Sequence, residues 1–327
     1  MKPKIFIAYF PWPYILNDLN ILKSNFNIRT LIYKGIRRHP RILINMFKGC
    51  LWSNLIISYT ADTHTFLLVL LSKILGKKIF VILTGYETAN IPEINYGVMR
   101  FPYSFQAWKT RFILKNADKI IVCSEFHKKE ALTYISSKRI SRIYWGIDVS
   151  KFKPGRKKEN LVITVGGVTN INTKRKGLET FVKSAKYLPN LKFILIGKHY
   201  DNSIDYLKSI APSNVLFAGF VPDEELIRYY QKAKVYCQVS LHEAFGVSLA
   251  EAMACECVPV VTNQGALPEV VGNTGFYVPY GDVKATAEAI EKALLSSNKG
   301  KEARGRVVNK FSLRKREGEL LKLIYGI

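Results

Sequence analysis

The chain has 327 residues, 48% of them hydrophobic, and its 49 Lys and Arg against 25 Asp and Glu give a formal net charge of +24. The length and apolar fraction predict a globular protein of two domains. Its five cysteines are odd in number and contain no CxxC pair, which argues against a disulfide framework or a zinc site and for a reducing, cytoplasmic compartment.

The amino terminus reads as a strand and not as a signal peptide, because its apolar run is short and proline follows at once. No segment reaches the roughly 20 uninterrupted apolar residues of a membrane span. The positive excess is steeper in the first half, where residues 1–150 hold 22 Lys and Arg against 8 Asp and Glu. This charge favours an acidic partner, such as an anionic membrane surface at the inner face of the membrane, a phosphorylated acceptor or nucleic acid.

Short apolar runs in the first half alternate with helical segments. Buried parallel strands are predicted at residues 5–10, 28–33, 55–59, 78–83 and 120–123. Helices are predicted between them, among them residues 60–75 and 108–116. This alternation with short connections predicts a doubly wound parallel sheet.

A basic segment, Lys34–Arg41, holds four Lys or Arg residues and His39, and it leads into an amphipathic helix at residues 42–52 with Phe47 and Trp52 on its apolar side. A basic cluster beside apolar and aromatic residues fits an anionic membrane surface. The alternative is a solvated loop followed by an ordinary packing helix.

A long loop, residues 84–97, follows the fourth strand and carries Glu87 and Glu93. Long loops at strand ends often carry function. We therefore expect Glu87 to take a polar role on the acceptor side of a site.

The second half opens with a strand at residues 161–165, followed by Gly166 and Gly167. Two glycines after a strand allow the backbone to approach a ligand closely. A basic loop then leads to Lys176 and an amphipathic helix at residues 178–185.

Residues 235–259 read as a strand, a loop with Glu243 and Gly246, and a helix from Val247 that contains Glu251. The first amides of a helix lack partners inside it and favour anions. A carboxylate accepts two hydrogen bonds at once, which suits vicinal sugar hydroxyls. Two carboxylates around one anion site would match a nucleotide-sugar, whereas the alternative is a pair of ordinary surface glutamates.

At this point the sequence resembles a known family. The stretch E-A-F-G-V-S-L-A-E, from Glu243 to Glu251, is similar to the E-x-F-G-x-x-x-x-E signature of the retaining glycosyltransferases of family 4, and an archaeal member is one possibility. Further motifs of that family follow its order: A-D at Ala117-Asp118, G-I-D at Gly146–Asp148, F-x-P at Phe152–Pro154 and K-G at Lys176-Gly177. The resemblance implies an α/β protein with the GT-B fold, in which two Rossmann-like doubly wound domains face a central cleft.

The resemblance also implies roles for these residues. Glu251 would hold the ribose hydroxyls of the donor, and Glu243 would hold hydroxyls of the donor sugar. Lys176 and the main-chain amides of Phe245, Gly246 and Val247 would stabilise the diphosphate. The two remaining donor-binding elements would be the Gly166-Gly167 turn, which approaches the donor, and the main chain around Val221, which holds the base.

Two positions depart from the family pattern. Gly167 stands where the family has arginine, so Lys174 or Arg175 would replace that phosphate contact. Tyr86 and Glu87 follow Gly85, where the family often has a histidine.

We predict an N-terminal acceptor domain at residues 1–154, a donor domain at 155–310 and a terminal helix at 311–327 that crosses back to the first domain. The enzyme would be a retaining, hexosyltransferase-type glycosyltransferase that moves a sugar from a nucleoside-diphosphate sugar to an acceptor hydroxyl of a glycan, lipid-linked sugar or polysaccharide. No metal or other cofactor is expected, because the sequence lacks a D-x-D motif and the nucleotide-sugar is a co-substrate.

Two alternatives stay open. One is another GT-B enzyme, a nucleotide-sugar epimerase. The other is a non-enzymatic basic protein that binds nucleic acid or membrane; the sequence has no stacking-aromatic array or recognised nucleic-acid motif, so nucleic acid is not expected as a partner.

Overall fold

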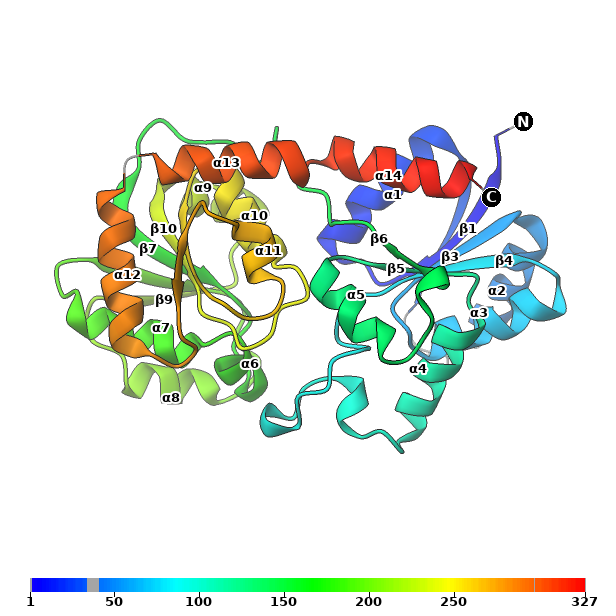
Figure 1. Ribbon diagram of the computed structural model, residues 1–327, viewed down its shortest axis with the longest axis horizontal. Helices are drawn as coiled ribbons and strands as arrows, with labels where there is room; N and C mark the ends of the chain where they lie inside the picture. Colours follow the sequence, from blue (N-terminus) through cyan, green and yellow to red (C-terminus); the bar gives the residue numbers. More distant parts are fainter. Residues whose placement is uncertain (1, 34–40, 297, 327) are drawn as a thin grey trace. The chain divides into compact units, whose positions relative to one another are not determined.

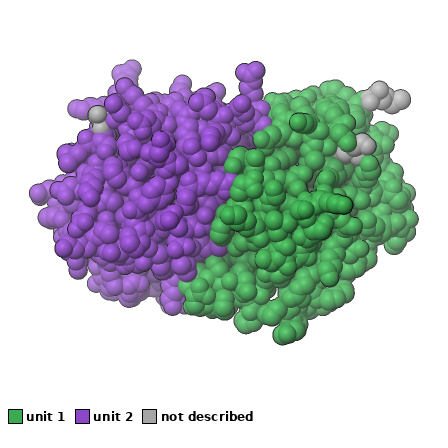
Figure 2. Space-filling view, viewed as in Figure 1, with its two compact units in different colours: residues 1–144, 317–327 green, residues 145–316 purple. Residues whose placement is uncertain are grey.

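The structure is a computed structural model that describes residues 2–33, 41–296 and 298–326. The chain forms two compact units, which Figure 2 colours separately: Met1–Tyr144 with Glu317–Ile327, and Trp145–Arg316. Each unit contains one six-stranded sheet in which every pair of neighbouring strands is parallel. Helices connect the strands of both sheets (Figure 1).

The sheet of the first unit has the order β2-β1-β3-β4-β5-β6. Its strands are β1 Lys4–Tyr9, β2 Asn27–Ile32, β3 Leu55–Tyr59, β4 Lys78–Ile82, β5 Lys119–Val122 and β6 Ile140–Arg142. Its helices are α1 Pro13–Asn25, α2 Arg41–Trp52, α3 Thr63–Ile74, α4 Phe105–Asn116 and α5 Glu125–Leu132, with short 3₁₀ turns at Pro92–Ile94, Val98–Arg100 and Ser137–Arg139. The central strands β1, β3 and β4 are almost wholly buried, as expected for uninterrupted apolar runs.

The direction of chain progression across this sheet reverses at β1, since β2 lies on one side of β1 and β3 on the other. Because parallel crossovers are right-handed, α1 then covers one face of the sheet and α2, α3 and α4 cover the opposite face. Figure 1 shows α1 beside the terminal helix α14 (Leu313–Tyr325), away from α2, α3 and α4.

The sheet of the second unit has the order β12-β11-β10-β7-β8-β9. Its strands are β7 Glu159–Val165, β8 Lys192–Ile196, β9 Val215–Gly219, β10 Ala233–Gln238, β11 Val258–Thr262 and β12 Phe276–Val278. Its helices are α6 Asn170–Arg175, α7 Leu178–Ser184, α8 Ser203–Ser209, α9 Asp223–Lys232, α10 Val247–Ala254, α11 Leu267–Val271, α12 Val283–Leu295 and α13 Lys299–Lys310, with a 3₁₀ turn at Ala185–Tyr187.

Here the progression reverses between β7 and β10, which are neighbours although α6 to α9 and two strands separate them in sequence. Open α/β sheets bind ligands at such a switch point, beyond the carboxyl ends of the two strands. The segments that leave β7 and β10 are the two that carry Lys176 and Glu243.

The compact units divide at residues 144/145 and 316/317, whereas the sequence predicted divisions at 154/155 and 310/311. Residues 145–154 pack with the second unit because Ile147 is hydrogen bonded through its backbone to Phe311 and Leu313 at 2.7 and 3.0 Å. The second half of α14 belongs to the first unit, where Asn25 Nδ2 donates to Glu317 Oε1 at 3.2 Å and the Tyr325 ring lies 5.2 Å from Phe26. Among the described residues, no helix combines the length and the hydropathy needed to cross a membrane.

Candidate functional site

Two loops meet at the switch point of the second unit. The loop after β10, residues 239–246, and the segment 166–177 after β7 are joined by a backbone hydrogen bond from Leu241 N to Arg175 O at 2.8 Å. Their charged side chains are consequently brought into one cluster, although they are 67 residues apart in sequence.

Glu243 is the centre of this cluster. Its Oε2 atom lies 3.3 Å from Lys176 Nζ and 3.6 Å from Arg175 Nη1, and it accepts a hydrogen bond from Gln238 Nε2 at 3.0 Å. Burial acts to raise the pKa of Glu243, but the charges of Lys176, Arg175 and His242 outweigh it and hold the pKa below its ordinary value. Glu243 is therefore an ionised carboxylate at neutral pH.

Lys176 is the only lysine that the described structure places against Glu243, and its side chain is 15% exposed. Burial lowers its pKa, Glu243 partly offsets that effect, and Arg175 adds to it. A cation held in this way is largely desolvated, so a bound anion would interact with it strongly.

Arg175 is one of the two residues, with Lys174, that the sequence offered in place of the family's arginine. Its guanidinium is fixed by Asn172 Oδ1 at 3.1 and 3.0 Å and by the carbonyl oxygen of His242 at 3.2 Å. Lys174 is exposed instead, and its backbone carbonyl accepts hydrogen bonds from the Tyr280 hydroxyl at 2.8 Å and from Gly177 N at 3.0 Å. Of the two proposed substitutes for the missing arginine, Arg175 alone is part of the Glu243 cluster.

Glycines allow the backbone segments to approach one another at this site. A Cβ atom on Gly177, whose φ is +63°, would lie 2.1 Å from the carbonyl oxygen of Val239 in the β10 loop. One on Gly265, φ +60°, would lie 2.6 Å from the carbonyl oxygen of Glu243, and one on Gly166 would lie 2.7 Å from Lys176 Cδ. Gly167 faces Tyr200 and not the charged cluster.

The start of α10 provides unpaired donors. Gly246 adopts φ +92° immediately before the helix, and within the described chain the backbone N–H groups of Gly246, Val247 and Ser248 have no hydrogen-bond partner. The Phe245 side chain is buried against Phe311, with ring centroids 5.4 Å apart, so its role is to anchor the loop.

Glu251 lies one turn into α10, in a different environment from Glu243. It accepts a hydrogen bond from the Tyr230 hydroxyl at 3.2 Å. Burial raises its pKa from 4.5 to about 8, because this hydrogen bond and the charge of Lys151 offset the loss of hydration only in part.

Tyr236 and Gln238, which sequence reasoning missed, connect the two glutamates. The buried Tyr236 hydroxyl lies 3.3 Å from Gln238 Oε1 and 2.9 Å from Ser248 Oγ. Burial is the main cause of its raised pKa, and the charges of both Glu243 and Glu251 also raise it. Both carboxylates therefore act on one hydroxyl. The signal in the sequence was a tyrosine and a glutamine two positions apart, hence on one face, at the end of a buried strand.

The remaining predicted residues lie elsewhere. Val221 lies in the connection between β9 and α9, outside the hydrogen bonds of the Glu243 cluster. Glu87 is buried in the first unit and accepts hydrogen bonds from the backbone N–H groups of Thr84 and Gly85 at 3.1 and 2.9 Å, so it holds its own loop together. Burial raises its pKa. The basic segment Lys34–Arg41 lies outside the described residues except for Arg41.

The five cysteines are all free and buried. Within the described residues, no group of three or more His, Cys, Asp or Glu side chains is arranged to hold a metal ion.

Comparisons with known proteins agree with this architecture. Residues 147–309 match the family described as glycosyl transferases group 1. The chain is 35% identical over 213 residues to the capsular polysaccharide biosynthesis glycosyltransferase CapM of Staphylococcus aureus, covering 59% of this chain and 54% of that protein. It is 28% identical over 203 residues to the O-antigen chain mannosyltransferase RfbU of Salmonella typhimurium, covering 58% and 56%. The chain thus spans about half the length of these relatives.

Two solved structures share the fold. HepE of Anabaena, in complex with UDP and glucose, has a TM-score of 0.81 at 15% identity, with 99% of this chain and 100% of that chain covered. Sucrose-phosphate synthase of Thermosynechococcus elongatus has a TM-score of 0.79 at 17% identity, with the same coverage of 99% and 100%. The predicted fold class, GT-B with two parallel Rossmann-like sheets, is confirmed.

Proposed function

We propose that this chain, whose residues 147–309 match the glycosyl transferases group 1 family, is a retaining glycosyltransferase that moves a hexose from a nucleoside-diphosphate sugar to an acceptor hydroxyl. The observation that carries the proposal is the cluster at the switch point. There Lys176, Arg175 and Gln238 hold the Glu243 carboxylate beside the unpaired N–H groups at the start of α10.

The cluster offers each part of such a donor a complementary group. The diphosphate would bind at Lys176 and the N–H groups of Gly246 and Val247, where negative charge grows as the glycosidic bond breaks. A preorganised donor of this kind contributes on the order of 3 kcal/mol to transition-state stabilisation. Glu243, whose ionised state is maintained by two cations, would accept hydrogen bonds from hydroxyls of the transferred sugar.

Glu251 would hold the ribose. A carboxylate accepts two vicinal hydroxyls, so ribose binding favours the ionised form of Glu251. Because its pKa is about 8 without ligand, donor binding would release a proton from this side chain near neutral pH. Tyr230 donates to the same carboxylate and orients it.

Retention of the anomeric configuration would follow from attack on the same face as the departing diphosphate. The pairing of Glu243 with two cations favours this route over covalent catalysis, because a carboxylate stabilised in this way is a weaker nucleophile. A glycosyl adduct on Glu243, detected by mass spectrometry of the wild-type protein incubated with donor, would contradict this route, as would a product of inverted configuration in an NMR assay.

The acceptor is proposed to be a sugar hydroxyl of a glycan, either free or lipid-linked. The names of the relatives, which refer to capsular polysaccharide and O-antigen chains, support this class.

Thermal-shift measurements with UDP-, GDP- and ADP-sugars test the proposal, since a ligand stabilises the folded state that it binds. We expect one donor to raise the melting temperature and Glu251→Ala to abolish that rise. No rise with any donor would overturn the proposal. Incubation with donor alone separates the epimerase alternative: release of epimerised sugar and nucleotide without an acceptor would assign the chain to that class.

A further inference from the structure

Helix α2 in the first unit exposes large apolar side chains on one strip. Leu43, Ile44, Phe47 and Leu51 are 45%, 55%, 44% and 51% exposed. Their spacing places them on one side of the helix, while the residues on its other side pack into the core of the unit. Because apolar side chains usually cluster at the surface only where something covers them, this strip indicates an interaction site.

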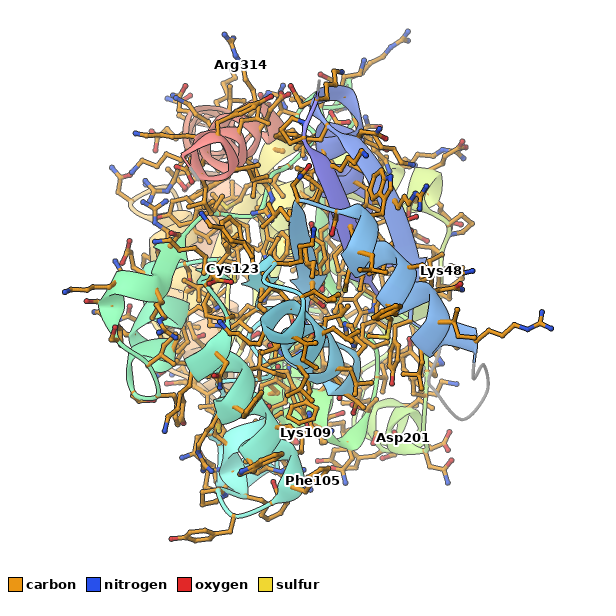
Figure 3. The ribbon with its side chains drawn as sticks, turned by 90° about the vertical axis from the view of Figure 1, so that its right-hand side faces the viewer. Lys48, Phe105, Lys109, Cys123, Asp201 and Arg314 are labelled. Atoms are coloured by element: carbon orange, nitrogen blue, oxygen red, sulfur yellow. The ribbon has the colours of Figure 1, made fainter. Side chains whose placement is uncertain are left out.

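A second apolar group lies at the start of α4. Tyr103 and Phe105 are 99% and 70% exposed, and Trp108, half exposed, stacks on Phe105 with ring centroids 5.5 Å apart. Helix α3 lies between the two groups and exposes Ile74 at 77%. Figure 3 shows α2, α3 and α4 next to one another on the near side of the first unit, with Lys48 on α2 and Phe105 at the start of α4.

The charge of this region is strongly one-sided. Residues 41–116 hold nine Lys and Arg against three Asp and Glu, and α2, α3 and α4 contain no acidic residue at all. Of the three acids, Asp62 accepts a hydrogen bond from Thr63 N at the start of α3, Glu87 is buried in its own loop, and Glu93 is exposed in the 3₁₀ turn Pro92–Ile94. The exposed cations Arg41 and Lys48 border the apolar strip of α2.

We propose that the exposed side of α2 and α4, here called the α2–α4 face, docks on the surface of an anionic lipid bilayer. The apolar side chains would enter the boundary between headgroups and acyl chains, and the aromatic rings would lie at the interface. Arg41 and Lys48 would meet anionic headgroups, each contributing roughly a fivefold gain in partitioning.

The charge distribution favours a bilayer over a second copy of this chain. In a two-fold symmetric contact through the α2–α4 face, Arg41 and Lys48 of each copy would meet a face whose helices α2, α3 and α4 carry no acidic residue to pair with them. A bilayer with anionic lipids has the opposite sign and no fixed shape to match. The proposal is independent of the nucleotide-sugar site, which lies in the second unit.

Sedimentation with vesicles tests the proposal, comparing phosphatidylcholine alone with phosphatidylcholine that contains phosphatidylglycerol. We expect the full chain to bind the anionic vesicles and to be released by salt. Ile44→Ser with Phe47→Ser should lower the partition coefficient roughly tenfold or more through lost apolar burial. Arg41→Gln with Lys48→Gln should lower it by roughly twenty-fold.

Matched control variants come from α12 in the second unit, where Leu295 is 82% exposed and Lys292 is exposed. Leu295→Ser and Lys292→Gln should leave vesicle binding unchanged, and far-UV circular dichroism spectra and cooperative thermal unfolding like those of the wild type would show that every variant is folded.

Three results would overturn the proposal: no binding of the wild type to anionic vesicles, equal binding of the α2 variants and wild type, or equal loss in the α12 controls. A wild-type dimer that becomes a monomer in Ile44→Ser with Phe47→Ser would assign the face to a second copy of the chain instead.

Discussion

At the scale of single residues, the environments of two glutamates on one loop–helix unit push their ionisation in opposite directions. Lys176 and Arg175 keep Glu243 ionised, while burial holds Glu251 protonated at neutral pH before ligand binds. Such a division is common where two carboxyl groups have different tasks. The contributions of Glu243 and Glu251 to stability should therefore differ in their pH dependence.

The stability of the protein should reflect the raised pKa of Glu251. Between pH 4.5 and about 8 the unfolded chain loses a proton from this carboxyl that the folded chain retains, so the free energy of unfolding falls as pH rises. The stabilisation is complete below pH 4.5 and lost above about 8. Glu251→Gln removes this pH dependence. As pH rises from 4.5 to about 8, the melting temperature of Glu251→Gln should therefore increase relative to that of the wild type.

Glu243→Gln serves as the control for that measurement. The lowered pKa of Glu243 in the wild type gives stability that is present above pH 4.5 and is lost only as pH falls below that value. The difference in melting temperature between Glu243→Gln and the wild type should therefore stay constant between pH 5 and 8. Parallel melting curves for Glu251→Gln and wild type across the same range would contradict a raised pKa.

Lys176 and Lys174 provide a matched pair for testing the diphosphate contact. Lys176→Met removes the buried cation beside Glu243 and should lower kcat by about 100-fold, which corresponds to roughly 3 kcal/mol. Lys174→Met, two positions away and exposed, should change kcat by less than about twofold, as is usual for surface substitutions. Equal losses in a transfer assay would place the diphosphate elsewhere.

At the scale of elements, the site depends on how closely the segment after β7 approaches the loop after β10. Gly177→Ala would force a Cβ against the carbonyl oxygen of Val239, whereas Gly219→Ala, at a similar φ of +68°, meets nothing within 4 Å. Both variants suffer left-handed backbone strain of about 1 kcal/mol. We expect Gly177→Ala alone to lose further stability and donor affinity, as measured by urea unfolding and thermal shift.

If the two glycine variants are equally stable and both retain donor affinity, the close approach is not needed to hold Glu243. Gly219 is suited to this comparison because its backbone strain matches and its surroundings are open.

The periodicity of the sequence was sufficient to predict most elements, because buried parallel strands are short apolar runs between helical patterns. Helix α4 was expected to begin at Trp108 but begins at Phe105, where the Ser104 hydroxyl accepts from Ala107 N at 3.2 Å. A serine cap before exposed aromatic residues is a weak signal, since nothing apolar and buried marks the first turn.

The candidate site was predictable only in part. Lys176 and Glu243 follow strands and stand in recognisable motifs, so the sequence indicated both. The roles of Gln238 and Tyr236 depend on the pairing of β10 with β7, because this pairing brings the segment after β7, which carries Lys176, next to the end of β10. Lys174 and Arg175 were the two options, and the packing of α6 against the β10 loop brings the Arg175 side chain, and not that of Lys174, to the Glu243 cluster.

At the scale of the whole molecule, the two units are not consecutive halves of the chain. The last residues return to the first unit, which is why a boundary drawn from linker composition at residues 154/155 differs from the division at 144/145. Polar linker composition marks exposure, whereas compact units are decided by long-range contacts such as those between Ile147 and the start of α14.

The returning segment should consequently stabilise the unit that the amino terminus begins. Leu320 is 1% exposed, on a stretch of α14 that also contacts Asn25 and Phe26 of the first unit through Glu317 and Tyr325. Leu320→Ala should lower the free energy of unfolding by about 2–5 kcal/mol, because it removes a buried side chain and leaves a cavity. Urea unfolding followed by circular dichroism measures this change.

Leu295→Ala is the matched control, since the same truncation is made at a side chain that is 82% exposed, and it should cost less than about 0.5 kcal/mol. Leu320→Ala should lower the stability of the first unit and not of the second. The donor should therefore still raise the melting temperature of the second unit in this variant. Equal stability of the two leucine variants would show that the last residues of α14 do not complete the first unit. The two-unit description would then need its boundary at residues 310/311, where the sequence pattern alone had placed it.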